Sequence, residues 1–157
     1  MTVCAWNREC LFGSVAGETV NLSDCGKIIA DVWNKLPERF PSVELDEFVI
    51  MPNHIHGILI LNIVVGAGLA LPNSLPGTQH KQTGAASGAP TLGAIMRTFK
   101  SISAVTVNRR FDRPGVPVWQ RNYYEHIIRD EKELHSIREY IRYNPLKWDE
   151  DEENPHI

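Results

Sequence analysis

The chain has few cysteines, and their arrangement argues against two common roles. Cys4, Cys10 and Cys25 are odd in number and lack the paired spacing of a zinc site or a disulfide framework. We therefore expect reduced thiols and a cytoplasmic location. The first residues show no charged segment followed by an apolar core, so we expect no signal peptide.

A long hydrophobic run is also missing. The mostly apolar stretch 57–71 is shorter than the roughly 20 residues that span a bilayer, and it contains Asn62 and several glycines. We interpret this stretch as a buried strand that continues into a linker. The sequence therefore predicts no membrane partner.

The chain lacks a positive net charge. Its formal charge of −3 argues against a protein that coats nucleic acid without specificity. The charges are unevenly placed, because residues 97–129 hold seven arginines and lysines but only two acidic side chains. This basic middle predicts a phosphate-binding surface, although an ordinary charged helix face accounts for it equally well.

Length and composition favour one domain with an insertion and a tail. The 157 residues, 43% of them hydrophobic, suffice for a single core, which we place in residues 1–148. Residues 63–90 are rich in Gly, Ala, Pro, Ser and Thr and are predicted to be a mobile loop. Residues 149–157 are predicted to be an acidic, solvated tail. For the loop, the alternative is a second ordered hairpin built on Val64, Val65, Leu69 and Leu71.

Turn residues and hydrophobic spacing divide the chain into short elements. Ser23 and Thr91 have the chemistry of helix N-caps, and Pro52-Asn53 has that of a turn between two strands. The expected elements are a strand at 3–6, a small hairpin within 11–22, a helix at 24–36, strands at 44–51 and 54–61, a helix at 91–109, strands at 116–120 and 124–128, and a helix at 131–144.

Two histidines stand at the start of the predicted strand 54–61. Side chains two residues apart on a strand project from the same face, so His54 and His56 could share one divalent cation or a phosphate. The alternative is two polar residues on a solvated sheet face, which is the better explanation for an isolated His-x-His pattern.

The predicted helix 131–144 carries a tyrosine and an amide on one face. Its apolar residues recur at three- and four-residue spacing, and Pro145 disfavours helical geometry at Asn144. Tyr140 and Asn144 are four residues apart and can face the same way. A phenol and an amide oxygen could serve as nucleophile and metal ligand, whereas the alternative is that Tyr140 packs at the edge of the core.

Three ordered motifs together resemble the REP-associated tyrosine transposases. They are residues 51–57 (MPNHIHG), 119–129 (WQRNYYEHIIR) and 140–147 (YIRYNPLK). This family is related to small insertion-sequence transposases within the superfamily of His-hydrophobe-His single-strand endonucleases. The resemblance covers nearly the whole chain, from Thr2 to Trp148. The chain departs from the family by starting inside the expected first strand and by a long insertion after the histidine strand.

The resemblance implies a fold and a reaction. With the order of elements, it predicts an α+β fold of the ferredoxin-like split βαβ type, with an antiparallel sheet, helices on one face and a C-terminal catalytic helix. It implies that His54, His56 and Asn144 hold Mg²⁺ or Mn²⁺, and that Tyr140 cleaves single-stranded or hairpin repeat DNA through a 5′-phosphotyrosine intermediate. The predicted DNA-binding residues are Arg97, Lys100, Arg109, Arg110, Arg121, Tyr123 and Arg129.

Other functions fit parts of the pattern. The main alternative is a domesticated, sequence-specific DNA-binding protein that no longer cleaves. A metal hydrolase for small phosphoesters would use His54 and His56 without Tyr140, and a ferredoxin-like RNA-binding module would tolerate the loss of both histidines. His126 is a candidate general base, with a structural sheet histidine as the alternative. The family implies a bacterial, nucleoid-associated protein that is a monomer or a homodimer.

Overall fold

The computed structural model describes residues 1–62 and 90–155, which form a mixed α+β fold. The predicted mobile loop at 63–90 lies, apart from residue 90, outside the described residues. Among the described residues, no helix is long and apolar enough to cross a membrane.

An antiparallel sheet of three strands forms the centre of the fold. Its order is β1-β5-β4, and β4 and β5 form the hairpin predicted around Pro52-Asn53. A separate two-stranded hairpin, β2-β3, turns at Gly17, whose φ of +62° favours glycine. The strands are β1 (Thr2–Cys4), β2 (Gly13–Ala16), β3 (Thr19–Leu22), β4 (Val43–Ile50) and β5 (His54–Leu61).

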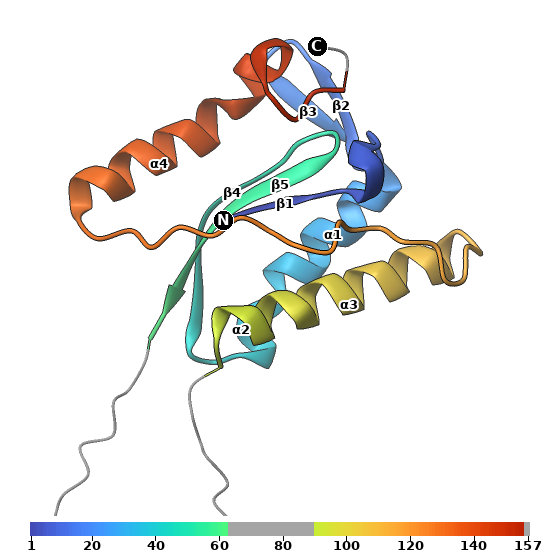
Figure 1. Ribbon diagram of the computed structural model, residues 1–157, viewed down its shortest axis with the longest axis horizontal. Helices are drawn as coiled ribbons and strands as arrows, with labels where there is room; N and C mark the ends of the chain where they lie inside the picture. Colours follow the sequence, from blue (N-terminus) through green and yellow to red (C-terminus); the bar gives the residue numbers. More distant parts are fainter. Residues whose placement is uncertain (63–89, 156–157) are drawn as a thin grey trace, which may run out of the picture.

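Helices lie on both sides of this sheet. Figure 1 shows α1 and α3 on one side and α4 on the other. Ser23, Thr91 and Asp130 each accept a hydrogen bond from the backbone N–H three residues later, so the three predicted helix starts are confirmed. The helices are α1 (Asp24–Asn34), α2 (Leu36–Arg39), α3 (Leu92–Arg110), α4 (Glu131–Tyr143) and the 3₁₀ helices η1 (Trp6–Arg8) and η2 (Asn144–Glu150).

The two short strands predicted at 116–120 and 124–128 are wrong. The chain there makes only isolated antiparallel bridges, Ala5 to Trp119 and Thr2 to Tyr124, beside β1. Pro117 lacks the N–H that a strand needs, which limits continuous pairing. The segment nevertheless follows β1 along its free edge.

Aromatic side chains fill the layer between the sheet and the two helices α1 and α3. Trp33 stacks on Phe48, with ring centroids 4.6 Å apart, and meets Phe99 edge-on at 5.4 Å. Trp119 is also a core residue, and its Nε1 donates to the hydroxyl of Ser103 at 2.9 Å. This packing holds β5, and therefore its histidines, in a rigid setting.

Gly57 is required for that packing, which gives a stability prediction. A Cβ at Gly57 would lie 2.6 Å from Cζ2 of Trp33, whose ring is wedged between Phe48 and Phe99. We expect Gly57→Ala to lower the free energy of unfolding by about 1–3 kcal/mol in a denaturant titration. In the control Gly93→Ala, the nearest atom to the new Cβ is 3.9 Å away, so stability should be unchanged or higher by up to about 1 kcal/mol. Equal stability of Gly57→Ala and the natural protein would contradict this role of Gly57.

Candidate metal centre and tyrosine

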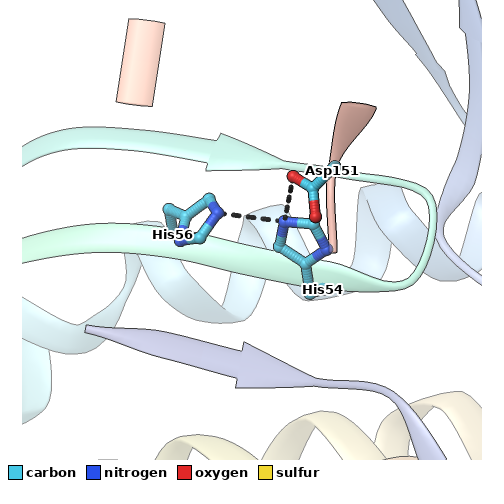
Figure 2. Close-up of side chains that lie close together, drawn as sticks. All are labelled: His54, His56 and Asp151. Atoms are coloured by element: carbon cyan, nitrogen blue, oxygen red, sulfur yellow. Dashed lines mark hydrogen bonds and ion pairs between the residues drawn. The ribbon is translucent and has the colours of Figure 1, made fainter. Parts of the chain in front are cut away.

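Two histidines of β5 meet at their ring nitrogens. His54 and His56 project from the same face of the sheet because they lie two residues apart on the strand. Their rings face each other (Figure 2), with the Nε2 atoms 3.0 Å apart. Both side chains are buried. The alternative of polar side chains on a solvated face is therefore wrong.

Burial keeps both rings neutral. It lowers the pKa of His56 to about 3, with smaller effects from His54 and the N-terminal ammonium group. Burial also lowers the pKa of His54, although the carboxylates of Asp151 and Glu153 partly oppose it. A neutral imidazole has one nitrogen lone pair, so both rings can act as ligands near pH 7.

A carboxylate that the sequence patterns did not single out faces the same point. Asp151 follows η2, and its Oδ2 lies 3.9 Å from Nε2 of His54 (Figure 2). One ligand atom from each of Asp151, His54 and His56 lies within 4.8 Å of the other two. Because His54 is neutral, its contact with Asp151 is not a full ion pair, and three electron-pair donors converge here.

The acidic residues at the end of the described chain pack against the protein. Arg8 forms an ion pair with Glu153 at 2.8 Å, and the Glu153 carbonyl accepts a hydrogen bond from Asn53. Asp151 is nearly buried, with 8% of its side chain exposed. The prediction of a solvated tail is therefore wrong for Asp151 and Glu153, because long-range contacts hold them.

The helix α4, which carries Tyr140, ends close to His54. Tyr143 is the last residue of α4, so the α-helix ends where Pro145 predicted, but Asn144 keeps helical backbone angles and opens η2. Asn144 is 1% exposed, and its Oδ1 has no hydrogen-bond partner within the described part of the chain. Its amide affects the pKa of both His54 and Tyr140, so it lies close to each of them. A buried amide oxygen beside His54 is suited to a cation.

Tyr140 lies on the open side of this cluster. Its ring meets that of His56 edge-on, with centroids 5.3 Å apart, and the residue is 50% exposed. Burial of its inner part raises the pKa of the Tyr140 hydroxyl, and the nearby Asp151 carboxylate raises it further, whereas Asn144 lowers it. The hydroxyl is therefore protonated near pH 7.

Two ion pairs fix α4 on the edge strand β4. Arg138 donates to both carboxylate oxygens of Asp46, and Arg142 pairs with Glu47. Both acidic residues lie at an irregularity in the pairing of β4 with β5. The Arg138 guanidinium is the main cause that lowers the pKa of Asp46. These contacts hold the tyrosine helix over the histidine strand, and helix spacing alone could not reveal them.

An apolar groove of about 960 Å³ lies beside the cluster, between β5 and α4. His56 and Tyr140 line it together with apolar side chains such as Ile127. His126 and Glu133 also line it and contact each other at 2.7 Å. The groove thus connects the tyrosine with the segment that precedes α4.

The residues predicted to bind DNA do not form one surface. Arg97, Arg109 and Arg110 are exposed on α3, on the opposite side of the sheet from α4 (Figure 1). The ammonium group of Lys100 donates to backbone carbonyls in the segment after Trp119 and so holds that segment in place. The other three predicted residues lie in the segment before α4, where Arg121 and Arg129 are exposed and Tyr123 is half-buried.

The converging atoms fit a divalent cation. Two neutral imidazole nitrogens and a carboxylate oxygen converge, from His54, His56 and Asp151, and the buried amide of Asn144 lies beside His54. Nitrogen and oxygen donors in this mixture accept several divalent ions, so the donor set does not select one of them.

Comparison with known proteins gives one long match and one short match. An uncharacterized protein of Haemophilus influenzae is 45% identical over 152 residues, which is 97% of this chain and 82% of the relative. A second protein of that organism, provisionally named a REP-associated tyrosine transposase, is 53% identical over 30 residues, or 19% of this chain and 17% of the relative. No family model matches the chain, and no solved structure matches it significantly. The long match shows that this chain belongs to the family of the uncharacterized Haemophilus influenzae protein.

Proposed function

We propose that this protein is a metal-dependent tyrosine transposase that cleaves and transfers single-stranded DNA. The observation that carries the proposal is the convergence of Tyr140, Asn144 and the two histidines, which come from different elements of the fold. The short match to a protein named as a REP-associated tyrosine transposase supports the same reaction and a repeat-DNA substrate.

We also infer that the fold is of the ferredoxin-like split βαβ type. The bridges of Trp119 and Tyr124 place a fourth chain segment beside β1, so the order across the sheet is this segment, β1, β5 and β4. All neighbours are antiparallel, and α1 and α3 lie on one side (Figure 1). Strand order and helix placement both support this topology.

The chain's own groups suit the proposed reaction. A divalent cation held by His54, His56 and the adjacent oxygen donors would neutralise charge on the scissile phosphate. The Tyr140 oxygen attacks phosphorus, the bond from phosphorus to the 3′-oxygen breaks, and the products are a 5′-phosphotyrosine and a free 3′-hydroxyl. The phenol loses one proton and the 3′-oxygen gains one. Burial raises the pKa of Tyr140, so the phenol is protonated near pH 7 and this proton leaves in the course of the reaction.

The groove supports a single-stranded substrate. Its apolar walls come from β5 and α4 and include Tyr140. Bases that flank the scissile phosphate can therefore bury their faces in the groove. Unstacked bases pack favourably on apolar and aromatic side chains, whereas paired bases do not expose their faces. Arg121 and Arg129, which are exposed in the segment before α4, would then contact phosphates.

Labelled oligonucleotides test the proposal directly. Hairpin oligonucleotides from genomic repeats, with single-stranded flanks, are incubated with the protein and Mn²⁺ or Mg²⁺ and resolved on a denaturing gel. We expect a 3′-terminal label to migrate with the protein, because the protein is joined to the 5′-phosphate of the downstream fragment. A 5′-terminal label should appear in a shorter, free fragment. Cleavage without an adduct, or the opposite distribution of labels, would contradict the mechanism.

A DNA-binding protein without cleavage activity is the second candidate. The exposed arginines of α3 lie on the side of the sheet away from Tyr140, so they could bind phosphates independently of the tyrosine. This candidate predicts a retarded band on a native gel but no adduct with any divalent ion. The same oligonucleotides distinguish the two functions.

A further inference from the structure

The orientation of one buried amide determines which nitrogen of His54 carries the proton. Asn53 is fully buried, and its Nδ2 donates to the backbone carbonyls of Arg8 at 3.1 Å and Glu153 at 2.5 Å. Rotating this amide by 180° would point its oxygen at two other oxygens, so the amide has one acceptable orientation. Its Oδ1 is then the atom that lies 2.9 Å from Nδ1 of His54.

The Asn53 oxygen can only accept a hydrogen bond. Nδ1 of His54 must therefore be the donor, and in a neutral imidazole the other nitrogen, Nε2, carries the lone pair. This lone pair points toward His56 and the proposed cation. His54 is thus already in the tautomer that a metal ligand needs.

His56 has a different partner, which permits either tautomer. Its Nδ1 lies 2.8 Å from the hydroxyl of Thr2, and a hydroxyl can both donate and accept. Its Nε2 lies 3.0 Å from Nε2 of His54, which carries the lone pair of that ring. Two lone pairs at this distance repel each other, so without a cation His56 carries its proton on Nε2 and accepts from Thr2 through Nδ1. With a cation, Nε2 must be free, and the proton belongs on Nδ1.

We propose that His56 changes tautomer when the site takes up a divalent cation, and that Thr2 is the positioning residue for this change. The Thr2 hydroxyl donates to Nδ1 of His56 before the cation is bound and accepts from it afterwards. Asn53 holds His54 in one tautomer throughout. The inference rests on the cation-binding part of the proposed function and does not depend on DNA cleavage.

The tautomers are visible by nuclear magnetic resonance. Protein with ¹⁵N-labelled histidine is recorded without metal and with Zn²⁺, which serves as a diamagnetic probe. We expect the proton on Nδ1 of His54 and Nε2 of His56 without metal, and on Nδ1 of both rings with Zn²⁺. A proton already on Nδ1 of His56 without metal, or on Nε2 of His54, would overturn the proposal.

Two variants of Thr2 test its role. Thr2→Val keeps the shape but removes the hydroxyl, so we expect a 10- to 100-fold weaker Mn²⁺ affinity by calorimetry, as is typical when a ligand's outer partner is lost. Thr2→Ser retains a hydroxyl and should stay within about threefold of the natural affinity. Equal affinity of the Val and Ser variants would refute a role for the hydroxyl.

The outcomes separate this inference from the function on which it rests. If the natural protein binds neither Zn²⁺ nor Mn²⁺, the tautomer change and the proposed metal site both fail. If Zn²⁺ binds and the His56 tautomer stays the same, only the tautomer change fails. Both measurements use the protein without DNA, so a lack of cleavage activity affects neither.

Discussion

Tyr140→Phe is expected to reduce the covalent protein–DNA adduct by at least about 1,000-fold, because the substitution removes the attacking oxygen. Hairpin binding should stay within about tenfold, or about 1.4 kcal/mol. The phenylalanine ring retains the edge-on contact with His56, so the site keeps its shape. Denaturing gels measure the adduct, and native gels measure binding.

Tyr143→Phe is the matched control. Tyr143 is also on α4 and is equally exposed, but it is adjacent to Asn144 and so points about 100° away on an ideal helix. Tyr140 lies four residues before Asn144 and shares its face. The control variant should therefore form the adduct at a rate close to that of the natural protein.

Mass spectrometry of the trapped peptide decides between the tyrosines. The phosphotyrosyl group should map to Tyr140 after protease and nuclease digestion. A group on Tyr143, Tyr123 or Tyr124 would overturn the assignment of the nucleophile and the role of Asn144 with it. Normal adduct formation by Tyr140→Phe would have the same consequence.

Local rules predicted the helices and failed for the last strands. α1, α3 and α4 begin at cap residues and follow periodic apolar positions, which are properties of neighbouring residues. The segment 116–128 contains alternating and aromatic residues that resemble strands. Its actual conformation depends on β1, to which it makes two bridges, and on Lys100, which binds its carbonyls. Neither partner is close in sequence.

The proposed site was also predictable only where its residues are close in sequence. His54 with His56, and Tyr140 with Asn144, are each a short-range pattern whose geometry follows from a strand or a helix. Asp151 was missed because it stands among five consecutive acidic residues that look alike in the sequence. Only the path of η2, which returns the chain to β5, distinguishes it from its neighbours.

The second large effect is expected from the histidines themselves. His54→Ala or His56→Ala should reduce DNA cleavage by at least about 100-fold. Removal of a hydrogen-bond partner of a metal ligand already lowers activity by about 10- to 100-fold, and removal of the ligand itself should lower it at least as much. Hairpin binding should remain within about tenfold, since the exposed arginines supply it. The variant His56→Asn fills more of the buried space than alanine does. Loss of cleavage in this variant therefore cannot be ascribed to unfolding of an emptied site.

His135→Ala is the matched control, because His135 is exposed on α4 and contacts Glu139 rather than the cluster. It should retain natural cleavage and natural Mn²⁺ affinity. Calorimetry of the same variants tests whether loss of cleavage accompanies loss of the metal. His54→Ala and His56→Ala should lose Mn²⁺ binding, whereas His135→Ala should not. Full cleavage by a folded double variant at His54 and His56 would show that the reaction proceeds without these ligands. Tyr140 would then act without the cation, and the proposed metal centre would have to be abandoned.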